Sequence, residues 1–393
     1  MADALILRRG GSTCATIKFN NCTFSNLKLV TELAPYLTSR SGVSATTVGD
    51  YALFAGGYRF SYTSTVEAYN RNLVESTPTG LSQAREKILS TTVGNYALFA
   101  GGRASSSQNP STVEAYNSSL TRSTPTSLSQ GKEDGAATTV GNYALFGGGT
   151  NGGSWTSKVE AYNSSLTRST PTSLSHSSFH LAATTVGNYA LFGGGYYPSS
   201  YSSSVDTYNS SLSKSTATSL STSRDELSAT TVGNYALFAG GYSSSGDVST
   251  VESYNSSLSR STQTGLSKSR SRISATTVSN YALFAGGYNN SSSSSYSTVD
   301  AYSSNLTRSV PPNLKESKYN LASTTIGNFA LFGGGGQFSS SIVNALFLGV
   351  EMKLFKGSSY NFFGYEHEIT ENIQSIGIPS PATGYIKIKK TTL

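Results

Sequence analysis

The sequence contains few side chains that could carry out acid–base or metal chemistry. Its 393 residues include only three histidines: His176 and His180 lie in one segment, and His367 lies near the C-terminus. This spacing does not predict a three-ligand metal site. Two cysteines, Cys14 and Cys22, could pair with each other, but they are too few for a disulfide framework or a zinc site. We therefore expect no metal and no cofactor.

Acidic residues recur at one position of an internal repeat, and in five copies a basic residue follows eight positions later. The pairs are Glu114 and Arg122, Glu160 and Arg168, Asp206 and Lys214, Glu252 and Arg260, and Asp300 and Arg308. Such a row of carboxylates could form a catalytic or metal-binding ring. Because each acid has its own base, we instead expect ion pairs across a short hairpin, each worth about 0.2–1 kcal/mol. The first copy departs from this pattern, with Glu67 and Glu75 near Arg71.

No motif of a familiar catalytic class accompanies these residues. Gly-x-Ser-x-Gly nucleophile elbows and Walker-type phosphate loops are absent from the sequence. The paired glycines follow strand-like segments and do not open helices, so they do not predict a phosphate site. The sequence therefore predicts a protein that is not an enzyme.

The element that positions the recurring acids is built around a heptapeptide that occurs seven times. It reads Tyr51-Ala52-Leu53-Phe54-Ala55-Gly56-Gly57 and begins again at residues 96, 143, 189, 235, 281 and 329. The copies are 45 to 48 residues apart. Repeats of this length indicate one supersecondary unit per copy, stacked or arranged in a ring.

One copy, residues 228–266, contains four short segments rich in Thr, Val, Tyr and Phe, each bounded by Gly, Asn or Ser. These features predict four strands, a to d. Val232-Gly233-Asn234 provides a tight a–b turn, and Asn255-Ser256-Ser257 provides a c–d turn. Strand b is apolar throughout, as expected of a strand buried on both faces. Seven such units predict an all-β fold, a seven-bladed β-propeller with four-stranded blades.

The repeat resembles the kelch repeat in its Tyr-Ala-Leu-Phe run, in the Gly-Gly that follows, and in the later Val-Glu-Ala-Tyr. The resemblance covers roughly residues 27–346. Kelch repeats usually carry a tryptophan in strand d, whereas here strand d is rich in Ser and Thr and the single tryptophan, Trp155, lies in a loop. The resemblance implies a kelch-like propeller.

The last copy has strands a, b and c but no recognisable strand d. The segment Ser25–Thr31 resembles strand d of the second copy, Ser118–Thr124. We therefore expect this N-terminal strand to complete the seventh blade and close the ring, which removes exposed sheet edges. In that blade the acid and the base would be replaced together, by Asn344 and Leu29.

Three parts of the chain follow from these boundaries. Residues 1–24 form a non-repeat N-terminal segment, 25–346 form the propeller, and 347–393 form a non-repeat C-terminal segment. Tyr385–Lys389 alternates like a half-exposed strand. We expect the two end segments to pack together as a small β-rich extension that anchors the protein to other proteins.

Composition and charge argue against two classes of partner, nucleic acids and membranes. Charged residues make up only 12% of the chain, about half the usual share. The net charge of +7 is not gathered in the Lys/Arg-dense runs of nucleic-acid-binding proteins. The sequence contains no run of about 18 apolar residues, so it predicts no membrane-spanning helix. The apolar run before Arg8-Arg9 is too short for a secretory signal. We expect neither nucleic-acid binding nor membrane insertion.

The copies differ mainly in the b–c loops and the d–a connections, which leave a propeller on the same face. The connections carry charge, as in Arg85-Glu86-Lys87, and the b–c loops are rich in Tyr, Ser, Gly and Asn. That loop composition is typical of binding surfaces; free drift of unconstrained loops is the alternative explanation. The predicted binding residues are Tyr58, Arg59, Phe60, Tyr62, Arg103, Trp155, Tyr196, Tyr197, Tyr201, Tyr242, Tyr288, Tyr296 and Phe338.

These observations favour a structural or adhesive protein of a bacteriophage particle, located in the virion. Its end segments would attach to other virion proteins, and its variable loops would bind a host-surface glycan or protein. The opening Ala4–Gly11 resembles the start of some prophage tail or fibre proteins. The alternatives are an intracellular kelch-type protein-binding adaptor and a glycan-acting propeller enzyme, which would need carboxylates or histidines converging on the central channel.

Overall fold

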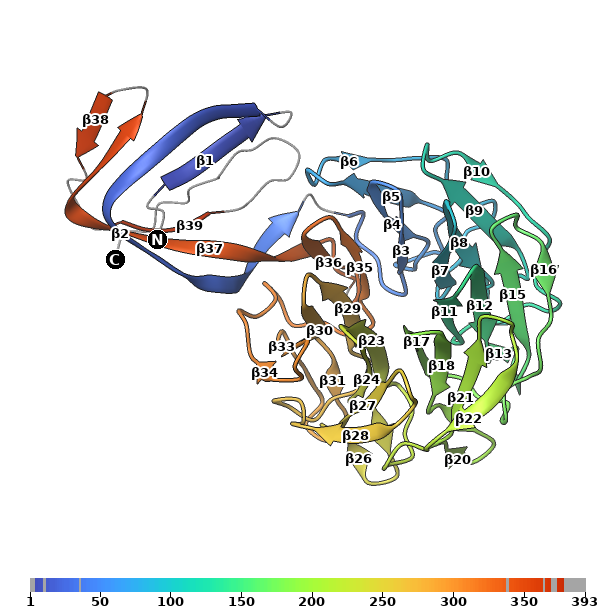
Figure 1. Ribbon diagram of the computed structural model, residues 1–393. Coiled ribbons are helices and arrows are strands. Elements are labelled where there is room, and N and C mark those ends of the chain that lie inside the picture. Colours follow the sequence, from blue (N-terminus) through green and yellow to red (C-terminus); the bar gives the residue numbers. More distant parts are fainter. Residues whose placement is uncertain are drawn as a thin grey trace. The chain divides into compact units, whose positions relative to one another are not determined.

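The structure, a computed structural model, describes residues 4–9, 12–34, 37–336, 339–362, 365–368 and 373–377, with side chains described at 37–336 and 339–347. These residues form β-strands and no helix. The chain divides into two units, Thr31–Ala345 and a second unit of Met1–Val30 with Leu346–Leu393. The larger unit is a ring of seven sheets around a central channel (Figure 1). The predicted all-β, seven-bladed propeller is confirmed.

Blades 1 to 6 are four-stranded antiparallel sheets in which strand a of the repeat pairs with b, b with c and c with d. From the channel outward, the strands a to d are β3 (Ser44–Val48), β4 (Tyr51–Ala55), β5 (Val66–Asn70) and β6 (Glu75–Ser76) in blade 1, and β7 (Leu89–Val93), β8 (Tyr96–Ala100), β9 (Val113–Asn117) and β10 (Arg122–Ser123) in blade 2. They are β11 (Ala136–Val140), β12 (Tyr143–Gly147), β15 (Val159–Asn163) and β16 (Arg168–Ser169) in blade 3, and β17 (Ala182–Val186), β18 (Tyr189–Gly193), β21 (Val205–Asn209) and β22 (Lys214–Ala217) in blade 4. They are β23 (Ser228–Val232), β24 (Tyr235–Ala239), β27 (Val251–Asn255) and β28 (Arg260–Gln263) in blade 5, and β29 (Ser274–Val278), β30 (Tyr281–Ala285), β33 (Val299–Ser303) and β34 (Arg308–Ser309) in blade 6. Four b–c loops contain small hairpins, which are β13 (Thr150–Asn151) with β14 (Ser154–Trp155), β19 (Tyr196–Tyr197) with β20 (Ser200–Tyr201), β25 (Tyr242–Ser243) with β26 (Gly246–Asp247), and β31 (Tyr288–Asn289) with β32 (Ser294–Ser295).

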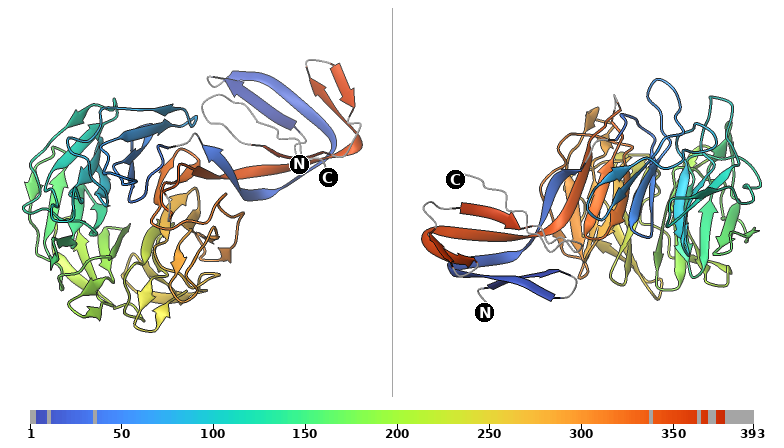
Figure 2. Two further views of the ribbon diagram at one scale, coloured as in Figure 1. Left: turned by 180° about the vertical axis from the view of Figure 1, so that it is seen from behind. Right: turned by 90° about the horizontal axis from the view of Figure 1, so that it is seen from above.

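Blade 7 combines strands from both ends of the sequence. Its sheet places β35 (Ala322–Ile326), β36 (Phe329–Gly333), β37 (Val343–Phe362) and β2 (Ser12–Ala34) side by side in that order. Figure 2 shows the blue β2 next to the orange-red β37. Because β2 contains the segment expected to close the ring, closure by an N-terminal strand is confirmed. In the same sheet β1 (Ala4–Arg9) pairs with β2, while β38 (Tyr365–Glu368) and β39 (Ile373–Gly377) pair with β37. The side chain of Leu29 lies outside the described part, so its partnership with Asn344 stays a prediction.

Every strand a contains two consecutive threonines, and the second of them lines the central channel in all seven blades. The hydroxyl of the second threonine donates a hydrogen bond to the main-chain carbonyl of its counterpart in the preceding blade: Thr92 to Thr47, Thr139 to Thr92, Thr185 to Thr139, Thr231 to Thr185, Thr277 to Thr231, Thr325 to Thr277, and Thr47 to Thr325. This threonine circle satisfies polar groups that would otherwise be costly to bury. Blade 7 therefore meets blade 1 through the same contacts as any other two neighbours.

The hydrophobic core is divided into clusters that lie between neighbouring blades. In one of them Phe99 of β8 meets Tyr116 of β9 edge-on, with ring centroids 5.9 Å apart. The Tyr116 hydroxyl donates to the carbonyl of Thr79, 2.8 Å away, which is in the preceding blade. Burying each such ring contributes about 1.5–3 kcal/mol. The same Phe–Tyr pair recurs in the other complete blades, for example as Phe238 and Tyr254.

The glycine pair after strand b lies where the connection into the next blade crosses. Gly240 has φ +63° and Gly241 has φ +109°, both unfavourable for L side chains. A Cβ on Gly240 would lie 2.6 Å from the carbonyl oxygen of Arg270. The amide of Gly241 donates to that same carbonyl at 3.0 Å. The repeated Gly-Gly thus fixes the path of the d–a connections.

In five blades a cation from the preceding connection enters the interior of the blade and meets the acid of strand c. The Nζ of Lys132 lies 2.6 Å from Glu160, and the guanidinium of Arg224 lies 2.5 Å from Glu252. None of these four side chains is exposed. The pairs Arg40–Glu67, Arg85–Glu114 and Arg270–Asp300 repeat this arrangement. We call the seven residues at this position, four before strand a, the interior ring: Arg40, Arg85, Lys132, Ser178, Arg224, Arg270 and Lys318.

The predicted ion pairs between strands c and d are only partly correct. The bases Lys214, Arg260 and Arg308 lie 2.9, 3.2 and 3.7 Å from Asp206, Glu252 and Asp300. In blades 2 and 3 the prediction is wrong, because Arg122 and Arg168 donate to the carbonyls of Gly80 and Ser127. Strand d lies at the outer edge of the blade, whereas the interior-ring cation is buried beside the acid. The interior-ring cation, and not the base on strand d, is therefore the main partner of the acid.

Blade 1 is no exception once the interior ring is known. Glu67 pairs with Arg40 at 2.5 Å and accepts a hydrogen bond from the amide of Thr38. Arg71, the expected neighbour of Glu67, instead forms an exposed pair with Asp50 at 2.8 Å.

Two blades lack one member of the interior pair. In blade 4 the interior ring holds Ser178, and Asp206 pairs with Lys214 instead. In blade 7 the acid is replaced by Asn344, and the buried Lys318 donates to the carbonyl of Ile342 at 2.8 Å. Burial lowers the pKa of Lys318 to about 8, against the opposing charge of Glu316.

Candidate binding site at the channel mouth

Seven residues, each two positions before strand a, encircle one mouth of the channel. This mouth ring consists of Gly42, Lys87, Asp134, His180, Glu226, Arg272 and Asn320. All have a left-handed backbone, with φ between +50° and +61°. Amides of the ring donate to carbonyls of the preceding member, as from Glu226 to His180 and from Arg272 to Glu226, both at 3.0 Å. These inter-blade bonds hold the backbone in a conformation that costs non-glycine residues about 1–2 kcal/mol.

The mouth ring borders a cavity of about 580 Å³. A second ring, one residue further along each connection, lies behind it and is mostly apolar: Val43, Ile88, Gly135, Leu181, Leu227, Ile273 and Leu321. Ser41, Glu86, Tyr319 and Gly336 complete the wall. A cavity of this size is within the range of about 300–1,000 Å³ that is usual for small-ligand pockets.

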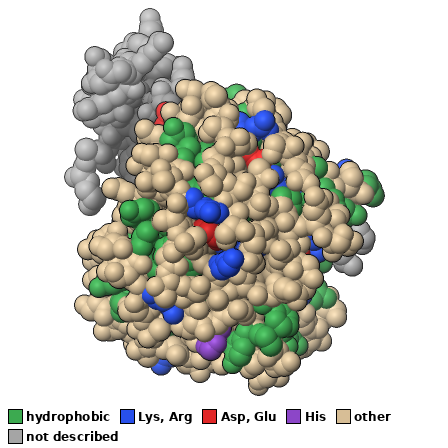
Figure 3. All heavy atoms as spheres, turned by 90° about the vertical axis from the view of Figure 1, so that its right-hand side faces the viewer, with side chains coloured by type: hydrophobic (Ala, Val, Ile, Leu, Met, Phe, Trp, Pro, Cys, Tyr) green, Lys and Arg blue, Asp and Glu red, His purple; other side chains and the backbone are tan. Residues whose placement is uncertain are grey.

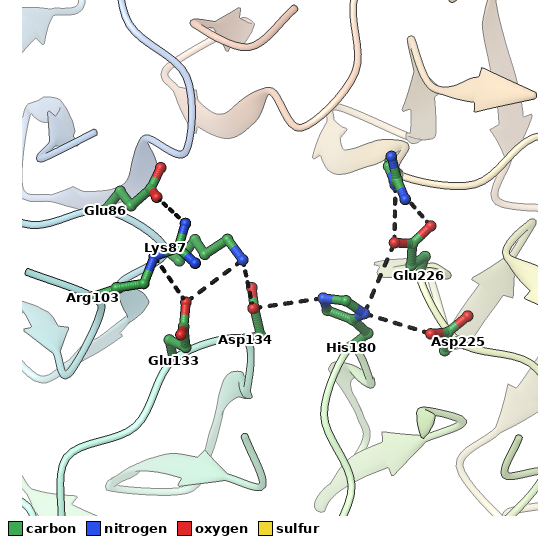
Figure 4. Close-up of polar contacts among 9 residues, drawn as sticks. Glu86, Lys87, Arg103, Glu133, Asp134, His180, Asp225 and Glu226 are labelled. Carbon is green, nitrogen blue, oxygen red and sulfur yellow. Dashed lines mark hydrogen bonds and ion pairs between the residues drawn. The ribbon is translucent and has the colours of Figure 1, made fainter. Parts of the chain in front are cut away.

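Charged side chains of the mouth ring alternate in sign around blades 2 to 6 (Figure 4). The Nζ of Lys87 lies 2.7 Å from Asp134, and the Nε of Arg272 lies 2.8 Å from Glu226. The imidazole of His180 lies between them, with Nε2 3.6 Å from Asp134 and Nδ1 3.9 Å from Glu226. Each charge therefore has a neighbour of opposite sign.

A second group of charges contacts this row. Arg103 donates to Glu86 at 2.5 Å and lies 3.6 Å from Glu133. Asp225 lies 3.5 Å from Nδ1 of His180. These three carboxylates are at most 11% exposed, so they act mainly by orienting the cations that they contact.

The pKa values of this network follow from its charges. Burial alone would lower the pKa of His180, but the carboxylates of Asp134, Asp225 and Glu226 outweigh burial and raise it to about 9. Burial would likewise raise the pKa of Asp134, but His180 and Lys87 lower it to about 2. At neutral pH His180 is therefore an imidazolium and Asp134 a carboxylate.

The b–c loops and d–a connections lie on the same face, as predicted. Bridges join Tyr196 to Phe179, Tyr242 to Asp225, and Tyr288 to Ser271, each between the start of a b–c loop and a connection. The loop residues therefore surround the channel mouth. On the side of the molecule in Figure 3, Lys and Arg side chains are scattered among uncharged ones.

Four predicted binding residues come together with Phe179 in one aromatic arc across blades 3 to 5. Trp155 stacks on Phe179 with centroids 6.0 Å apart, and Phe179 meets Tyr196 at 5.8 Å. Tyr201 then meets Tyr196 at 5.1 Å and Tyr242 at 6.0 Å. The predicted tyrosines and tryptophan of the arc are half-buried. They are thus held in place while keeping part of each ring in contact with solvent.

The remaining predicted residues form smaller groups. Tyr58 and Tyr62 are in contact at 5.1 Å, Arg59 lies over the 85%-exposed ring of Phe60, Tyr197 stacks on His176, and Tyr288 packs against Tyr319. Arg103 belongs to the charged network and Tyr296 is half-buried in its loop. Phe338 lies outside the described residues. The sequence did not reveal Phe179 or His180 as site residues; comparing the position two before strand a among the copies would have shown the alternating charges.

Among the described residues, no group of three or more His, Cys, Asp or Glu side chains could hold a metal ion. Nor does this part of the chain contain a helix with the length and apolar character of a membrane span.

Comparison with known proteins identifies the fold and not the function. No protein-family model matches the sequence, and no curated protein matches it. Many solved structures are similar in fold. One is described as "Structure of YjhT", with 12% sequence identity and a TM-score of 0.57, covering 71% of this chain and 99% of that one. At this identity the similarity shows a shared propeller fold alone.

Proposed function

We propose that the protein is a non-enzymatic recognition protein whose loop face binds a host-surface glycan. The carrying observation is the aromatic arc, Trp155, Phe179, Tyr196, Tyr201 and Tyr242, beside the polar cavity at the channel mouth. Half-buried tyrosines offer large contact area and a hydroxyl at a small entropic cost. The turns on the opposite face are nearly identical in all repeats, so the sequence differences between repeats lie on the face that carries the aromatic arc.

We propose further that this propeller is displayed on a bacteriophage particle. The low content of charged residues, the near-identity of the repeats and the non-repeat ends support this location. The end segments would join other virion proteins. Mass spectrometry of purified particles tests the location directly, and absence of the protein from the particles contradicts it.

A glycan-acting enzyme is the second candidate, because carboxylates and a histidine do converge on the channel mouth. Glycoside hydrolysis usually needs one carboxyl group whose raised pKa lets it act as an acid. Asp134 has a lowered pKa, and Glu226 is paired with Arg272. The observed pairing therefore favours binding over catalysis. No observation favours an intracellular kelch-type adaptor.

Replacing three tyrosines of blade 4 tests the binding function. The variant Tyr196→Ser, Tyr197→Ser and Tyr201→Ser should lose binding to bacterial host cells in a fluorescence assay. Its melting temperature should stay within a few degrees of the parent, since the side chains lie on a loop hairpin outside the core. Val74→Ser with Val310→Ser, which also removes exposed apolar surface, is the control and should bind normally. Undiminished binding by the tyrosine variant contradicts the proposed function.

A further inference from the structure

The charged groups that line the mouth cavity balance one another, and the three charges in direct contact with them, one positive (Arg103) and two negative (Glu133 and Asp225), add a net charge of only −1. Glu86, Asp134 and Glu226 supply three negative charges, and Lys87, His180 and Arg272 supply three positive charges when His180 is protonated. A ligand with a large net charge would gain little Coulomb energy in such a site, because attraction to one sign is offset by repulsion from the other. The lining therefore suits a neutral ligand.

The hydrogen-bonding groups of the wall alternate as well. Ionised carboxylates only accept hydrogen bonds, while the ammonium, imidazolium and guanidinium groups only donate them. Going around the mouth ring from Lys87 to Arg272, donors and acceptors follow one another in adjacent blades. A neutral ligand that fits this order needs closely spaced groups that both donate and accept, and hydroxyl groups do both.

Apolar residues also border the cavity, among them Ile88, Leu181 and Ile273. Their side chains belong to the hydrophobic clusters between blades and are at most 8% exposed, so they contribute little to the surface of the cavity. The rim also carries a ring cluster in blades 6 and 7, where Tyr288 and Tyr319 are 5.1 Å apart. The charged side chains can bind hydroxyl groups, and the ring of Tyr319, which lines the cavity, offers a surface for C–H groups of the same ligand.

We propose that the cavity at the channel mouth is a subsite for one or two neutral sugar units, held by the mouth ring. This inference rests on the proposed glycan-binding function and adds the class of glycan and the place of its key unit. The aromatic arc then supports the continuing oligosaccharide on the rim, and the alternating charges of the mouth ring select the unit in the cavity.

The chain itself suggests variants that keep the left-handed backbone. Asn320 and Gly42 occupy mouth-ring positions with φ of +51° and +61°, so Glu226→Asn and Asn320→Gly place a residue that this chain already uses there. The exposed Asp50, which pairs with Arg71, provides the control Asp50→Asn. Each variant is first compared with the parent by its melting temperature.

The experiment screens the full-length protein on a printed array of neutral, carboxylated, sulfated and amino oligosaccharides, and measures the best ligand by calorimetry. We expect a neutral oligosaccharide to bind best. Glu226→Asn should weaken its binding at least tenfold, Asn320→Gly should weaken it several-fold, and Asp50→Asn should leave it unchanged.

Three outcomes overturn the inference. If a charged glycan is the best ligand, the balanced charges of the cavity do not select a neutral ligand. Unchanged binding by both mouth variants, with loss in the tyrosine variant of blade 4, places the glycan on the aromatic arc alone and leaves the proposed function intact. Binding to protease-sensitive receptors on cells, without binding to any glycan on the array, shows that the loop face recognises a protein.

Discussion

The interior ring and the mouth ring are two positions apart in every d–a connection, yet they differ in almost every physical respect. The interior ring is nearly uniform, with Arg or Lys in six of seven blades, and its side chains are buried. The mouth ring has a different residue in each blade, and cations such as Arg272 keep about a third of their surface exposed, 34% for Arg272. One backbone segment thus carries a buried, nearly uniform side chain and a variable, partly exposed one only two residues apart.

The comparison separates what the fold requires from what it permits. An interior cation is positioned by the blade's own acid, as Arg224 is by Glu252, so changing one partner leaves the other buried and uncompensated. A mouth-ring side chain is held mainly through its backbone, by amide-to-carbonyl bonds that any residue can make. Side chains at the mouth can therefore vary without unfolding the ring.

The largest expected effect comes from breaking an interior pair. Glu252→Gln leaves the buried guanidinium of Arg224 without its counter-charge and should lower the free energy of unfolding by about 3–5 kcal/mol. The matched change in blade 4, Asp206→Asn, should cost only about 1 kcal/mol, because Lys214 is 16% exposed and can turn to solvent. Denaturant unfolding of both variants measures the difference. Equal losses would mean that the interior ring is not the main partner of the acids.

A smaller effect is expected from the mouth ring and appears as a pH dependence. Since the pKa of His180 is raised above its unfolded value of about 6.5, its contribution is complete below pH ~6.5 and is lost as pH rises through about 9. The loss should amount to about 1–3 kcal/mol, given about 1.4 kcal/mol per pKa unit and partial solvent access. His180→Asn should remove this part of the stability profile between pH 6.5 and 9. An identical profile in the variant contradicts the assignment.

The smallest effect is expected outside both rings. Asp50 and Arg71 are 67% and 49% exposed, so Arg71→Ala should change the free energy of unfolding by less than about 0.5 kcal/mol. The effect should also fall in 1 M salt, because exposed pairs are screened. A loss comparable to that of Glu252→Gln would remove the contrast between buried and exposed pairs.

The sequence allowed the ring to be predicted because its signals are local. The heptapeptide count set the number of blades, and the resemblance of 25–31 to a strand d indicated how the ring closes. The predicted partners of the acids were correct in blades 4 to 6 and wrong in blades 2 and 3. The buried cations were missed because they lie 27 to 30 residues earlier along the chain, as with Arg40 and Glu67 or Arg270 and Asp300. A base eight residues away was the visible candidate, and only burial decides between the two.

The site was predicted in part for the same reason. Tyrosine-rich loops are visible as composition, so Tyr196, Tyr201 and Tyr242 could be named in advance. The mouth ring depends on a left-handed backbone at residues such as His180 and Glu226, which sequence does not indicate outside glycine and asparagine. Its charges were noticed in the connections but could not be assigned to the channel.

The threonine circle has a consequence for how the ring closes. All seven hydrogen bonds run in one sense around the channel, and the bond from Thr47 to Thr325 does not differ in kind from the other six. The contact between blades 7 and 1 is therefore of the same kind as the other six, and what distinguishes the closure of this ring lies inside blade 7, where β2 pairs with β37.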